Sequence, residues 1–351
     1  MPKTPAYAAF SAREPLRAHT IDRRDPGPHD VVIDILFCGV CHSDVHQVRD
    51  EWGGSKFPMV PGHEIVGRVT RVGEKVTKLR PGDLAGVGCI VDSCRECPPC
   101  KAGLEQFCQR GGAFTYNGTE MDRKTPTYGG YSTQVVVTES FVLRVPEKLD
   151  PAAAAPLLCA GITTYSPLRQ HGAKAGDRIA VVGLGGLGHM AVKLARSLGA
   201  EVTVFSTSAG KEEDARRLGA KDFAVSRDPK TFKTLAGSFD LVLNTLSAKH
   251  DLAPYVGLLR PKGSLVLLGV PPEPHVIPAF ALIAGNRNLA GSMIGGIAET
   301  QEMLEHCAAH DIVSDIEIIP VQQINEAYER MMRSDVRYRF VIDTASFTAR
   351  S

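Results

Sequence analysis

The segment Ile179–Gly188 reads IAVVGLGGLG and decides the fold of the second half of the chain. Its four leading apolar residues predict a short buried strand, and a helical pattern follows the glycines at His189–Leu198. Glycines 183, 185 and 188 have the G-x-G-x-x-G spacing, which between a strand and a helix is typical of a dinucleotide-binding turn. Such a turn admits a pyrophosphate to the amides of a helix N-terminus. The alternative is a plain glycine-rich turn.

Short apolar runs alternate with helical patterns from about Pro151 onward, and the alternation weakens after about Asn286. The apolar runs are Ile179–Val182, Glu201–Phe205, Leu241–Leu243 and Leu265–Val270. A second helical pattern covers Glu212–Leu218. This alternation predicts βαβ units and a doubly wound parallel sheet.

The first 150 residues are β-rich instead, so the chain as a whole is predicted to be α/β. Strands are expected at Val31–Phe37, Glu64–Val72 and Tyr131–Val137, and a closing strand at Asp335–Asp343. The length of 351 residues suggests about two domains.

Charge and hydropathy indicate no macromolecular partner. The formal net charge is +1, so neither nucleic acid nor an anionic membrane surface is indicated. The N-terminus has no apolar stretch like a signal peptide, and the longest apolar runs fall short of the roughly 20 residues that span a bilayer. We expect a cytoplasmic protein.

The nine cysteines, an odd number, argue against a disulfide framework in a chain without a signal peptide. Four of them form a C-x2-C-x2-C-x7-C cluster in a loop without helical period: Cys94, Cys97, Cys100 and Cys108. Four thiolates complete the tetrahedron that Zn²⁺ prefers, so this is predicted to be a closed, structural zinc site. The alternative is four free cysteines.

A second, looser set of metal-type residues consists of Cys41, His63 and Cys159. Cys41 follows one expected strand and His63 precedes another, so rigid elements would position both. Three ligands would leave zinc an open position that polarises an alcohol or carbonyl oxygen. Residue chemistry alone leaves ordinary packing as an equal alternative. The remaining Cys38, Cys89 and Cys307 are interpreted as small buried hydrophobic residues.

The end of the second strand of the doubly wound sheet carries hydroxyls and a lysine, at Ser206, Thr207, Ser208 and Lys211. NAD specificity requires an Asp or Glu at this point to hold the adenosine ribose. The absence of a carboxylate favours the 2′-phosphate of NADP(H). The alternative is a solvated loop with helix-capping serines.

The whole chain resembles the medium-chain, zinc-dependent alcohol dehydrogenases, and within them the NADP-dependent cinnamyl alcohol dehydrogenase-like branch. The resemblance rests on motifs in order along the chain: CHSDVH at 41–46, PGHEIVG at 61–67, the four-cysteine loop, TYGGYS at 127–132, LCAGITTY at 158–165 and DVRYRF at 335–340. It implies a GroES-like catalytic domain with two zinc sites at 1–154 and 291–351, and a Rossmann NADP-binding domain at 155–290.

The resemblance implies roles for residues near the open site. Cys41, His63 and Cys159 would bind the catalytic zinc, Glu64 could enter its coordination sphere, and Asp44 would accept a hydrogen bond from His63. The alternative for Glu64 and Asp44 is a buried, satisfied polar pair. Ser43 would take the substrate proton and His46 would pass it to solvent, as histidine exchanges protons near neutral pH. The alternatives are a helix N-cap for Ser43 and a surface position for His46.

Further contacts follow from the resemblance. The cofactor is expected at the turn and at three outlying positions: Gly183, Leu184, Gly185, Gly186, Leu187, Gly188, Thr163, Val270 and Met293. Thr163 could instead bond back to its own helix backbone. Trp52, Tyr116 and Ile294 are candidates for the substrate pocket, with Met293 beside them, and ordinary core or interface is the alternative for each.

The sequence therefore predicts an NADP(H)-dependent zinc alcohol dehydrogenase that interconverts primary alcohols and aldehydes. An apolar, aromatic pocket favours a broad reductase of aromatic and medium-chain aldehydes. A dedicated cinnamyl alcohol dehydrogenase or a polyol dehydrogenase remains the alternative; a zinc-free quinone reductase and a non-catalytic NADPH-binding protein fit the retained ligands less well. Asn288–Ile294 resembles the edge strand that pairs two cofactor domains in dimers of this family, so the resemblance implies a homodimer.

Overall fold

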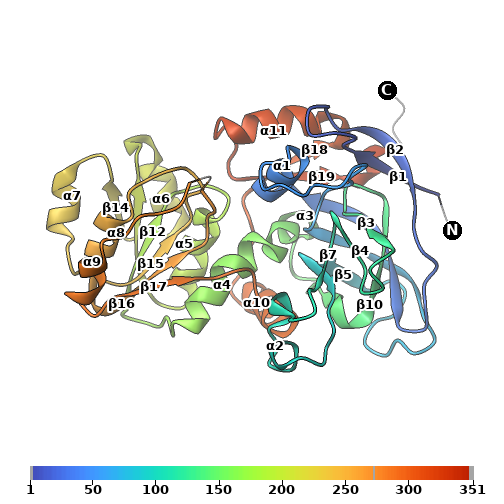
Figure 1. Cartoon of the computed structure of the whole chain (residues 1–351), viewed down its shortest axis with the longest axis horizontal. Coiled ribbons are helices and arrows are strands. Elements are labelled where there is room, and N and C mark those ends of the chain that lie inside the picture. Colours follow the sequence, from blue (N-terminus) through green and yellow to red (C-terminus); the bar gives the residue numbers. More distant parts are fainter. Residues whose placement is uncertain (1–2, 272, 348–351) are drawn as a thin grey trace. The chain divides into compact units, whose positions relative to one another are not determined.

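The computed structural model describes residues 3–271 and 273–347, which form two compact units (Figure 1). Unit 1 takes the described residues of Met1–Cys159 and Gly295–Ser351, and unit 2 is formed by Ala160–Ile294. No helix in the described part of the chain is long and apolar enough to cross a membrane.

Unit 1 is built around a seven-stranded mixed sheet with the order β11-β5-β4-β3-β19-β18, and β10 also pairs with β3. The strands are β3 (Asp30–Gly39), β4 (Ile65–Val72), β5 (Leu84–Val87), β10 (Gln134–Thr138), β11 (Leu143–Arg144), β18 (Ile316–Pro320) and β19 (Arg339–Asp343). Only β18 and β19 run parallel; the other pairs are antiparallel. The β-branched run Val31–Ile33 is fully buried, which explains why β3 lies at the centre.

The pairing of β3 with β4 brings two distant segments together. The strands are antiparallel, with Cys38 opposite Ile65, so the end of β3 lies beside the start of β4. Cys41 follows β3 at the first turn of α1 (His42–Val48), and His63 and Glu64 come directly before β4. The sheet therefore places the Cys41 and His63 segments at one edge.

Shorter elements complete unit 1. Its remaining strands are β1 (Lys3–Ala8), β2 (Arg17–Asp22), β6 (Ile90–Asp92), β7 (Ala113–Phe114), β8 (Gly118–Thr119) and β9 (Pro126–Thr127). Its other helices are α2 (Pro98–Lys101), α3 (Pro151–Ala154), α10 (Ile297–Ala309) and α11 (Ile324–Met332).

Unit 2 is a six-stranded parallel sheet with the order β14-β13-β12-β15-β16-β17 and helices around it (Figure 1). The strands are β12 (Arg178–Val182), β13 (Glu201–Ser206), β14 (Asp222–Val225), β15 (Phe239–Asn244), β16 (Leu259–Leu267) and β17 (Asn288–Gly291). The helices are α4 (Ala160–Gln170), α5 (Gly188–Ser197), α6 (Glu212–Leu218), α7 (Pro229–Thr234), α8 (Ala253–Gly257) and α9 (Ala279–Ile283). If the six strands are numbered from one to six along the chain, their order across the sheet is 3-2-1-4-5-6. This is the Rossmann arrangement, so the predicted fold is confirmed.

The core of unit 2 explains its strand pattern. Residues 179–182 of β12 are all buried, because helices cover both faces of a parallel sheet. Phe205 and Phe239 pack edge-on beneath it with ring centroids 5.8 Å apart. Continuous apolar runs are what such central strands require.

Some expected boundaries were wrong. The strand expected at Leu265–Val270 ends at Leu267, because the amides of Leu268 and Gly269 turn back to the carbonyl of Asn244. The closing strand begins only at Arg339, and the loop expected to be irregular contains α2, one helical turn with a proline at its start. Cys38 and Cys307 are fully buried, as predicted.

Candidate active site

Two groups of side chains in the described part of the chain could hold a metal ion, and both lie in unit 1. One consists of the four clustered cysteines and the other of Cys41, His63, Glu64 and Cys159. In each group the candidate ligand atoms lie within 4.8 Å of one another. The structure thus brings together both sets that the sequence singled out.

The closed cluster is formed by one loop around α2. The sulfurs of Cys97 and Cys100 are 3.4 Å apart, and those of Cys94 and Cys100 are 3.9 Å apart. Backbone amides of Glu96 and Cys97 lower the pKa of Cys94 to about 6, which favours the thiolate that a metal binds. The amide of Gln109 also points at the Cys97 sulfur, at 3.5 Å. Four thiols with backbone donors around them fit a Cys₄ zinc site.

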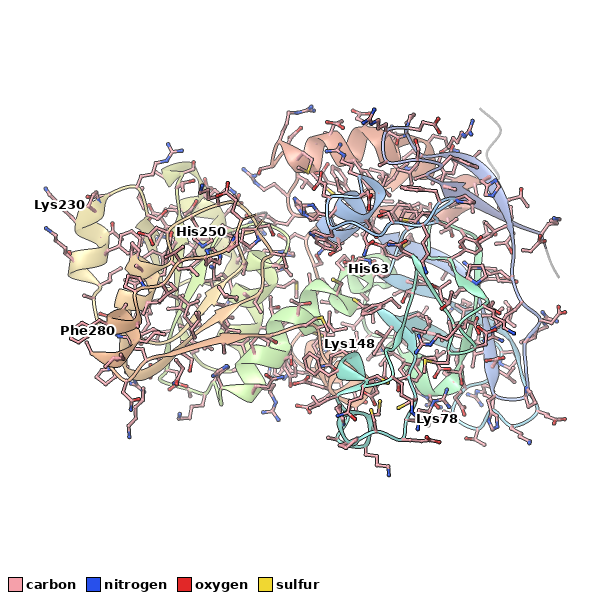
Figure 2. All side chains as sticks on the ribbon, viewed as in Figure 1. His63, Lys78, Lys148, Lys230, His250 and Phe280 are labelled. Carbon is pink, nitrogen blue, oxygen red and sulfur yellow. The ribbon has the colours of Figure 1, made fainter. Side chains whose placement is uncertain are left out.

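The open cluster draws on separate elements. Cys41 is the N-cap residue of α1, and Cys159 precedes α4; their sulfurs are 3.9 Å apart. His63, Glu64 and Cys159 are buried and Cys41 is half-buried, and Figure 2 labels His63 within unit 1. A hydrogen bond from the Cys159 thiol lowers the pKa of Cys41 well below its ordinary value. The pair therefore offers a thiolate to a cation.

Asp44 holds the histidine of this cluster. Its carboxylate is fully buried, and Oδ1 accepts a hydrogen bond from His63 Nδ1 at 3.1 Å. This leaves His63 Nε2 as the ring nitrogen for a metal. Burial alone would lower the pKa of His63, but the Asp44 charge and the thiol of Cys89 raise it well above its ordinary value.

An unpartnered carboxylate oxygen of Glu64 indicates that a cation fits in the open cluster. Its Oε1 pairs with Arg339, while Oε2 is buried and has no partner in the described part of the protein. Burial raises the pKa of Glu64 to about 7 despite Arg339. An orphaned buried carboxylate oxygen beside two thiols and an imidazole is the donor set expected around Zn²⁺.

Ser43 and His46 lie on α1, next to this cluster in sequence. Ser43 Oγ is 3.7 Å from Cys41 Sγ, and the N-cap position assigned to Ser43 as an alternative belongs to Cys41. His46 Nδ1 lies 2.5 Å from Glu51 Oε2, and its ring contacts Trp52 with centroids 5.0 Å apart. Sequence reasoning missed Glu51, because an acid five residues from a histidine has no distinctive spacing.

Two further residues lie against the cluster. The buried ring of Tyr116 stacks on His63 with centroids 5.8 Å apart. The interpretation of Cys89 as a buried hydrophobic residue was wrong: it is half-buried, and its thiol lies within hydrogen-bonding reach of Cys159. Cys89 Sγ is also 3.9 Å from the carbonyl of Leu158. Only the fold could reveal this, because 70 positions separate Cys89 from Cys159.

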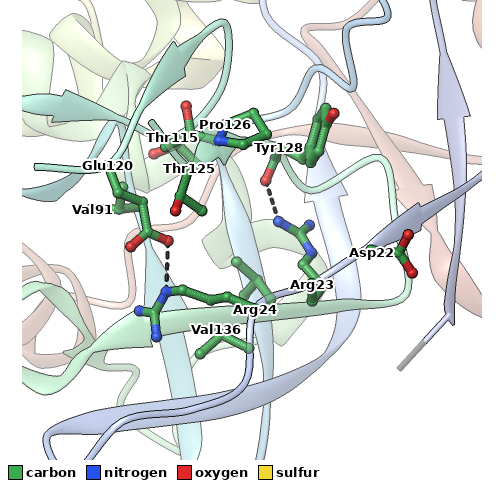
Figure 3. A pocket seen from close by; sticks show the side chains of 12 residues that line it. Asp22, Arg23, Arg24, Val91, Thr115, Glu120, Thr125, Pro126, Tyr128 and Val136 are labelled. Atoms are coloured by element: carbon green, nitrogen blue, oxygen red, sulfur yellow. Dashed lines mark hydrogen bonds and ion pairs between the residues drawn. The ribbon is translucent and has the colours of Figure 1, made fainter. Parts of the chain in front are cut away.

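A small cavity of about 50 Å³ elsewhere in unit 1 is lined by none of these metal-type residues (Figure 3). Arg24 pairs there with Glu120 at 2.6 Å, and Arg23 donates to the carbonyl of Tyr128 at 2.6 Å. Burial lowers the pKa of Arg23 to about 10, and its Nε has no partner among the described residues. The cavity has room for water, but it contains no reactive constellation.

The glycine turn of unit 2 has the three features that a pyrophosphate requires. Gly183 adopts a left-handed φ of +94°, which tightens the turn. A Cβ at Gly188 would lie 2.1 Å from the carbonyl oxygen of Gly183, so helix and strand approach closely. A Cβ at Gly185 would meet nothing within 4 Å, so the backbone there is open to a ligand. This open cradle fits a dinucleotide.

The tip of β13 lies beside that turn. Ser206 ends the strand and is buried, while Thr207 and Ser208 are exposed. Lys211 Nζ donates to the carbonyl of Leu184 at 3.0 Å, which places its charge at the glycine turn. Hydroxyls and an ammonium group around an open turn suit an additional phosphate.

The remaining predicted contact residues also lie in unit 2. Thr163 is buried on α4, Val270 follows β16 and Met293 follows β17, the last two being exposed. Ile294 has a left-handed φ of +42° at the end of the unit.

The fold and the two candidate ligand sets are typical of a zinc-binding dehydrogenase, and sequence comparison agrees. The family described as "Alcohol dehydrogenase GroES-like domain" matches residues 27–147, and "Zinc-binding dehydrogenase" matches residues 186–309. The chain belongs to the zinc-binding alcohol dehydrogenase family.

Individual relatives match nearly end to end. "NADP-dependent alcohol dehydrogenase C 1" of Mycolicibacterium smegmatis is 62% identical over 342 residues, covering 97% of this chain and 98% of the relative. "Aldehyde reductase YahK" of Escherichia coli is 55% identical, covering 99% of both chains. The solved cinnamyl alcohol dehydrogenase SbCAD4 of Sorghum bicolor superposes with a TM-score of 0.97 at 44% identity, covering 100% of both.

Proposed function

We propose that the chain is an NADP(H)-dependent zinc alcohol dehydrogenase that acts as a broad reductase of aromatic and medium-chain aldehydes. The observation that carries the proposal is the open cluster, in which Cys41, His63 and Cys159 meet an unpartnered Glu64 oxygen. The NADP-dependent and aldehyde reductase relatives support it.

In this proposal unit 1 holds two zinc ions and unit 2 holds the cofactor. Cys41, His63 and Cys159 bind the catalytic ion, with Glu64 as an exchangeable fourth donor, and the four-cysteine loop binds the structural ion. When bound, Zn²⁺ polarises the alcohol or aldehyde oxygen, and NADP(H) accepts or supplies hydride. Asp44 keeps the His63 ring oriented, because it fixes the proton on Nδ1.

Ser43 and His46 move the proton in this proposal. The Ser43 hydroxyl, beside Cys41, exchanges a proton with the substrate oxygen. His46, whose Nδ1 lies 2.5 Å from Glu51 Oε2, is the group proposed to exchange the proton with solvent. The ring of Trp52 lies against the His46 ring, and Trp52 and Tyr116 are proposed to supply aromatic surface for an apolar substrate.

The cofactor preference rests on the tip of β13. Ser206, Thr207, Ser208 and Lys211 would hold the 2′-phosphate, and the turn from Gly183 to Gly188 would hold the pyrophosphate. Thr163, Val270 and Met293 are proposed to contact the remainder of the cofactor.

The same unit supports a homodimer. β17 is the outermost strand of its sheet, and the nearby apolar side chains of Val276, Phe280 and Ile283 are 70% to 82% exposed. Figure 2 shows Phe280 projecting at the surface of unit 2. Covering such a surface with a second copy would remove an aggregation hazard. The described cysteines are all free, which suits a reducing compartment such as the cytoplasm.

The test measures oxidation of NADPH and NADH with cinnamaldehyde, benzaldehyde and hexanal, together with zinc content. Wild-type protein is expected to hold two zinc ions per chain and to prefer NADPH strongly. Cys41→Ala is expected to lose one zinc and all turnover. The matched control Cys307→Ala is expected to keep two zinc ions and the wild-type turnover. Equal kcat/KM with NADH would refute the cofactor assignment, and at most one zinc in wild type would refute the two-site assignment.

Substrate range separates the proposal from its alternatives. A dedicated cinnamyl alcohol dehydrogenase would reduce cinnamaldehyde far faster than hexanal, and a polyol dehydrogenase would oxidise sugar alcohols instead. Comparable kcat/KM for cinnamaldehyde, benzaldehyde and hexanal is the result expected for a broad reductase.

A further inference from the structure

Asp44 is contacted by more than the histidine that it orients. Its Oδ1 accepts from the amide of Gly62 at 3.1 Å, and its Oδ2 accepts from the amide of Cys41 at 2.9 Å. A second contact to Oδ2 comes from the hydroxyl of Tyr131, which donates to it at 3.4 Å. The carboxylate is thus held by the backbone of both ligand segments and by the hydroxyl of Tyr131, and the buried Tyr116 also hydrogen-bonds to it.

Tyr131 is itself backed by a second tyrosine. The hydroxyl of Tyr328, on α11, donates to the hydroxyl of Tyr131 at 3.4 Å. Tyr131 is fully buried and Tyr328 is nearly so. Burial, followed by the Asp44 charge, raises the pKa of both tyrosines well above the ordinary value, so both remain protonated donors. The chain Tyr328–Tyr131–Asp44–His63 runs from the C-terminal segment to the metal cluster.

The backbone is shaped to admit the Tyr131 ring. The amide of Tyr131 donates to the carbonyl of Pro61, and that of Gly130 to the carbonyl of Gly62, so this segment runs beside the one that carries His63. Gly62 has a φ of +102°, and a Cβ there would lie 2.7 Å from the Tyr131 ring. Any larger residue at position 62 would displace the tyrosine.

A buried phenol needs a hydrogen-bond partner, and a buried carboxylate needs donors. Removing the Tyr131 hydroxyl would take one donor from Asp44 and leave that side of the carboxylate facing a phenyl edge. The carboxylate would then be freer to turn, and the His63 ring, which it orients, would follow.

We infer that Tyr131, supported by Tyr328, is a positioning residue for the metal ligand His63 and acts through the Asp44 carboxylate. The inference rests on the proposed function, because it requires a metal at the open cluster. Its observable is the geometry and retention of that metal, which can be read without substrate.

The experiment replaces the metal of the open cluster with Co²⁺ and compares Tyr131→Phe, Tyr328→Phe and the double variant with wild type. Visible absorption bands report the coordination geometry, and a chelator reports the rate of metal loss. Tyr255→Phe is the matched control, since it removes a buried phenol from unit 2. Thermal unfolding is measured on every variant, so that metal effects are separated from folding effects.

Tyr131→Phe is expected to shift the Co²⁺ bands and to release the metal about tenfold faster, at the low end of the effect of losing an outer partner of a metal ligand. Tyr328→Phe is expected to have a smaller effect. The double variant should release metal no faster than Tyr131→Phe, because Tyr328 acts through Tyr131. kcat should fall in Tyr131→Phe while the KM for NADPH stays unchanged.

Unchanged bands and an unchanged release rate in Tyr131→Phe would overturn the inference, as would effects matched by Tyr255→Phe. Additive effects in the double variant would show that Tyr328 does not act through Tyr131. If Tyr131→Phe shifts the Co²⁺ bands but the wild-type protein reduces no aldehyde, the inference is supported and the proposed activity is refuted. Failure of wild type to hold a metal at this cluster would overturn both.

Discussion

Two alanine substitutions in the same glycine turn are predicted to have opposite effects: Gly185→Ala should weaken NADPH binding and keep stability, and Gly188→Ala should lower stability. At Gly185 an added methyl group meets no protein atom within 4 Å, and the residue has no left-handed φ. The folded protein can accept Gly185→Ala without strain, and the reduced freedom of the unfolded chain should raise stability by about 0.4–1 kcal/mol. The methyl group instead occupies the space offered to the cofactor.

The loss in binding follows from the bonds that a pyrophosphate makes to backbone amides. A hydrogen bond to a charged group contributes about 1.5–3 kcal/mol, so displacing the phosphate from one amide should raise the NADPH Kd by about 10- to 100-fold. Gly185→Ala should therefore bind NADPH poorly while it unfolds at or above the wild-type temperature.

Gly188→Ala should mainly lower the stability of the fold. Its methyl group would lie 2.1 Å from the Gly183 carbonyl oxygen, so β12 and α5 must separate. Such overpacking costs about 1–3 kcal/mol, or roughly 3–10 °C in the unfolding midpoint. Fluorescence titration with NADPH and thermal unfolding by circular dichroism measure both quantities. An NADPH Kd for Gly185→Ala within twofold of wild type would refute the reasoning.

Three further predictions concern unit 1. Cys89→Ser should keep two zinc ions per chain while Cys159→Ser keeps one, as measured by metal analysis; loss of zinc from Cys89→Ser would make that thiol a ligand. Arg339→Met should lower the free energy of unfolding by about 3–5 kcal/mol in a denaturant titration, because it leaves the buried Glu64 carboxylate unpaired; a change below 1 kcal/mol would contradict this. Cys97→Ser should lose the structural zinc and lower the midpoint of thermal unfolding while the open cluster keeps its metal; a loss of both metals would show that the clusters depend on each other.

The sequence predicted the parts of the fold that have a local signature. The strands β12 and β13 and the helix α6 appear where apolar runs and helical spacing indicated them. Helices α10 and α11 were missed, although the sequence holds a signal that could have found them: their buried residues recur at i, i+3, i+4 and i+7, as Thr300, Met303, Leu304 and Cys307 in α10 and as Ile324, Ala327, Tyr328 and Met331 in α11. Strand ends were missed where a backbone turn, as at Gly269, ends the pairing within an apolar run.

The candidate site divides in the same way. The four-cysteine loop could be predicted because its ligands lie within 15 consecutive residues. Cys41, His63 and Cys159 needed the resemblance, since their spacing carries no signal. Cys89 and the Tyr131–Tyr328 contact emerged only from the structure, because the fold brings together residues that are far apart in the sequence. Glu51 also emerged only there, because its spacing of five residues from His46 is not distinctive.

The two metal clusters differ in how they could be gained or lost during evolution. The closed cluster is contained in one surface loop, so a single exchange or deletion of that loop could remove all four ligands and leave the sheet intact. The open cluster joins segments up to 118 positions apart: the pairing of β3 with β4 brings the Cys41 and His63 segments together, and Cys159 comes from the segment just before α4. The open cluster therefore cannot be transferred to another protein as one segment. A descendant could lose it through a single substitution, but the cluster could be regained only in a protein that keeps this sheet.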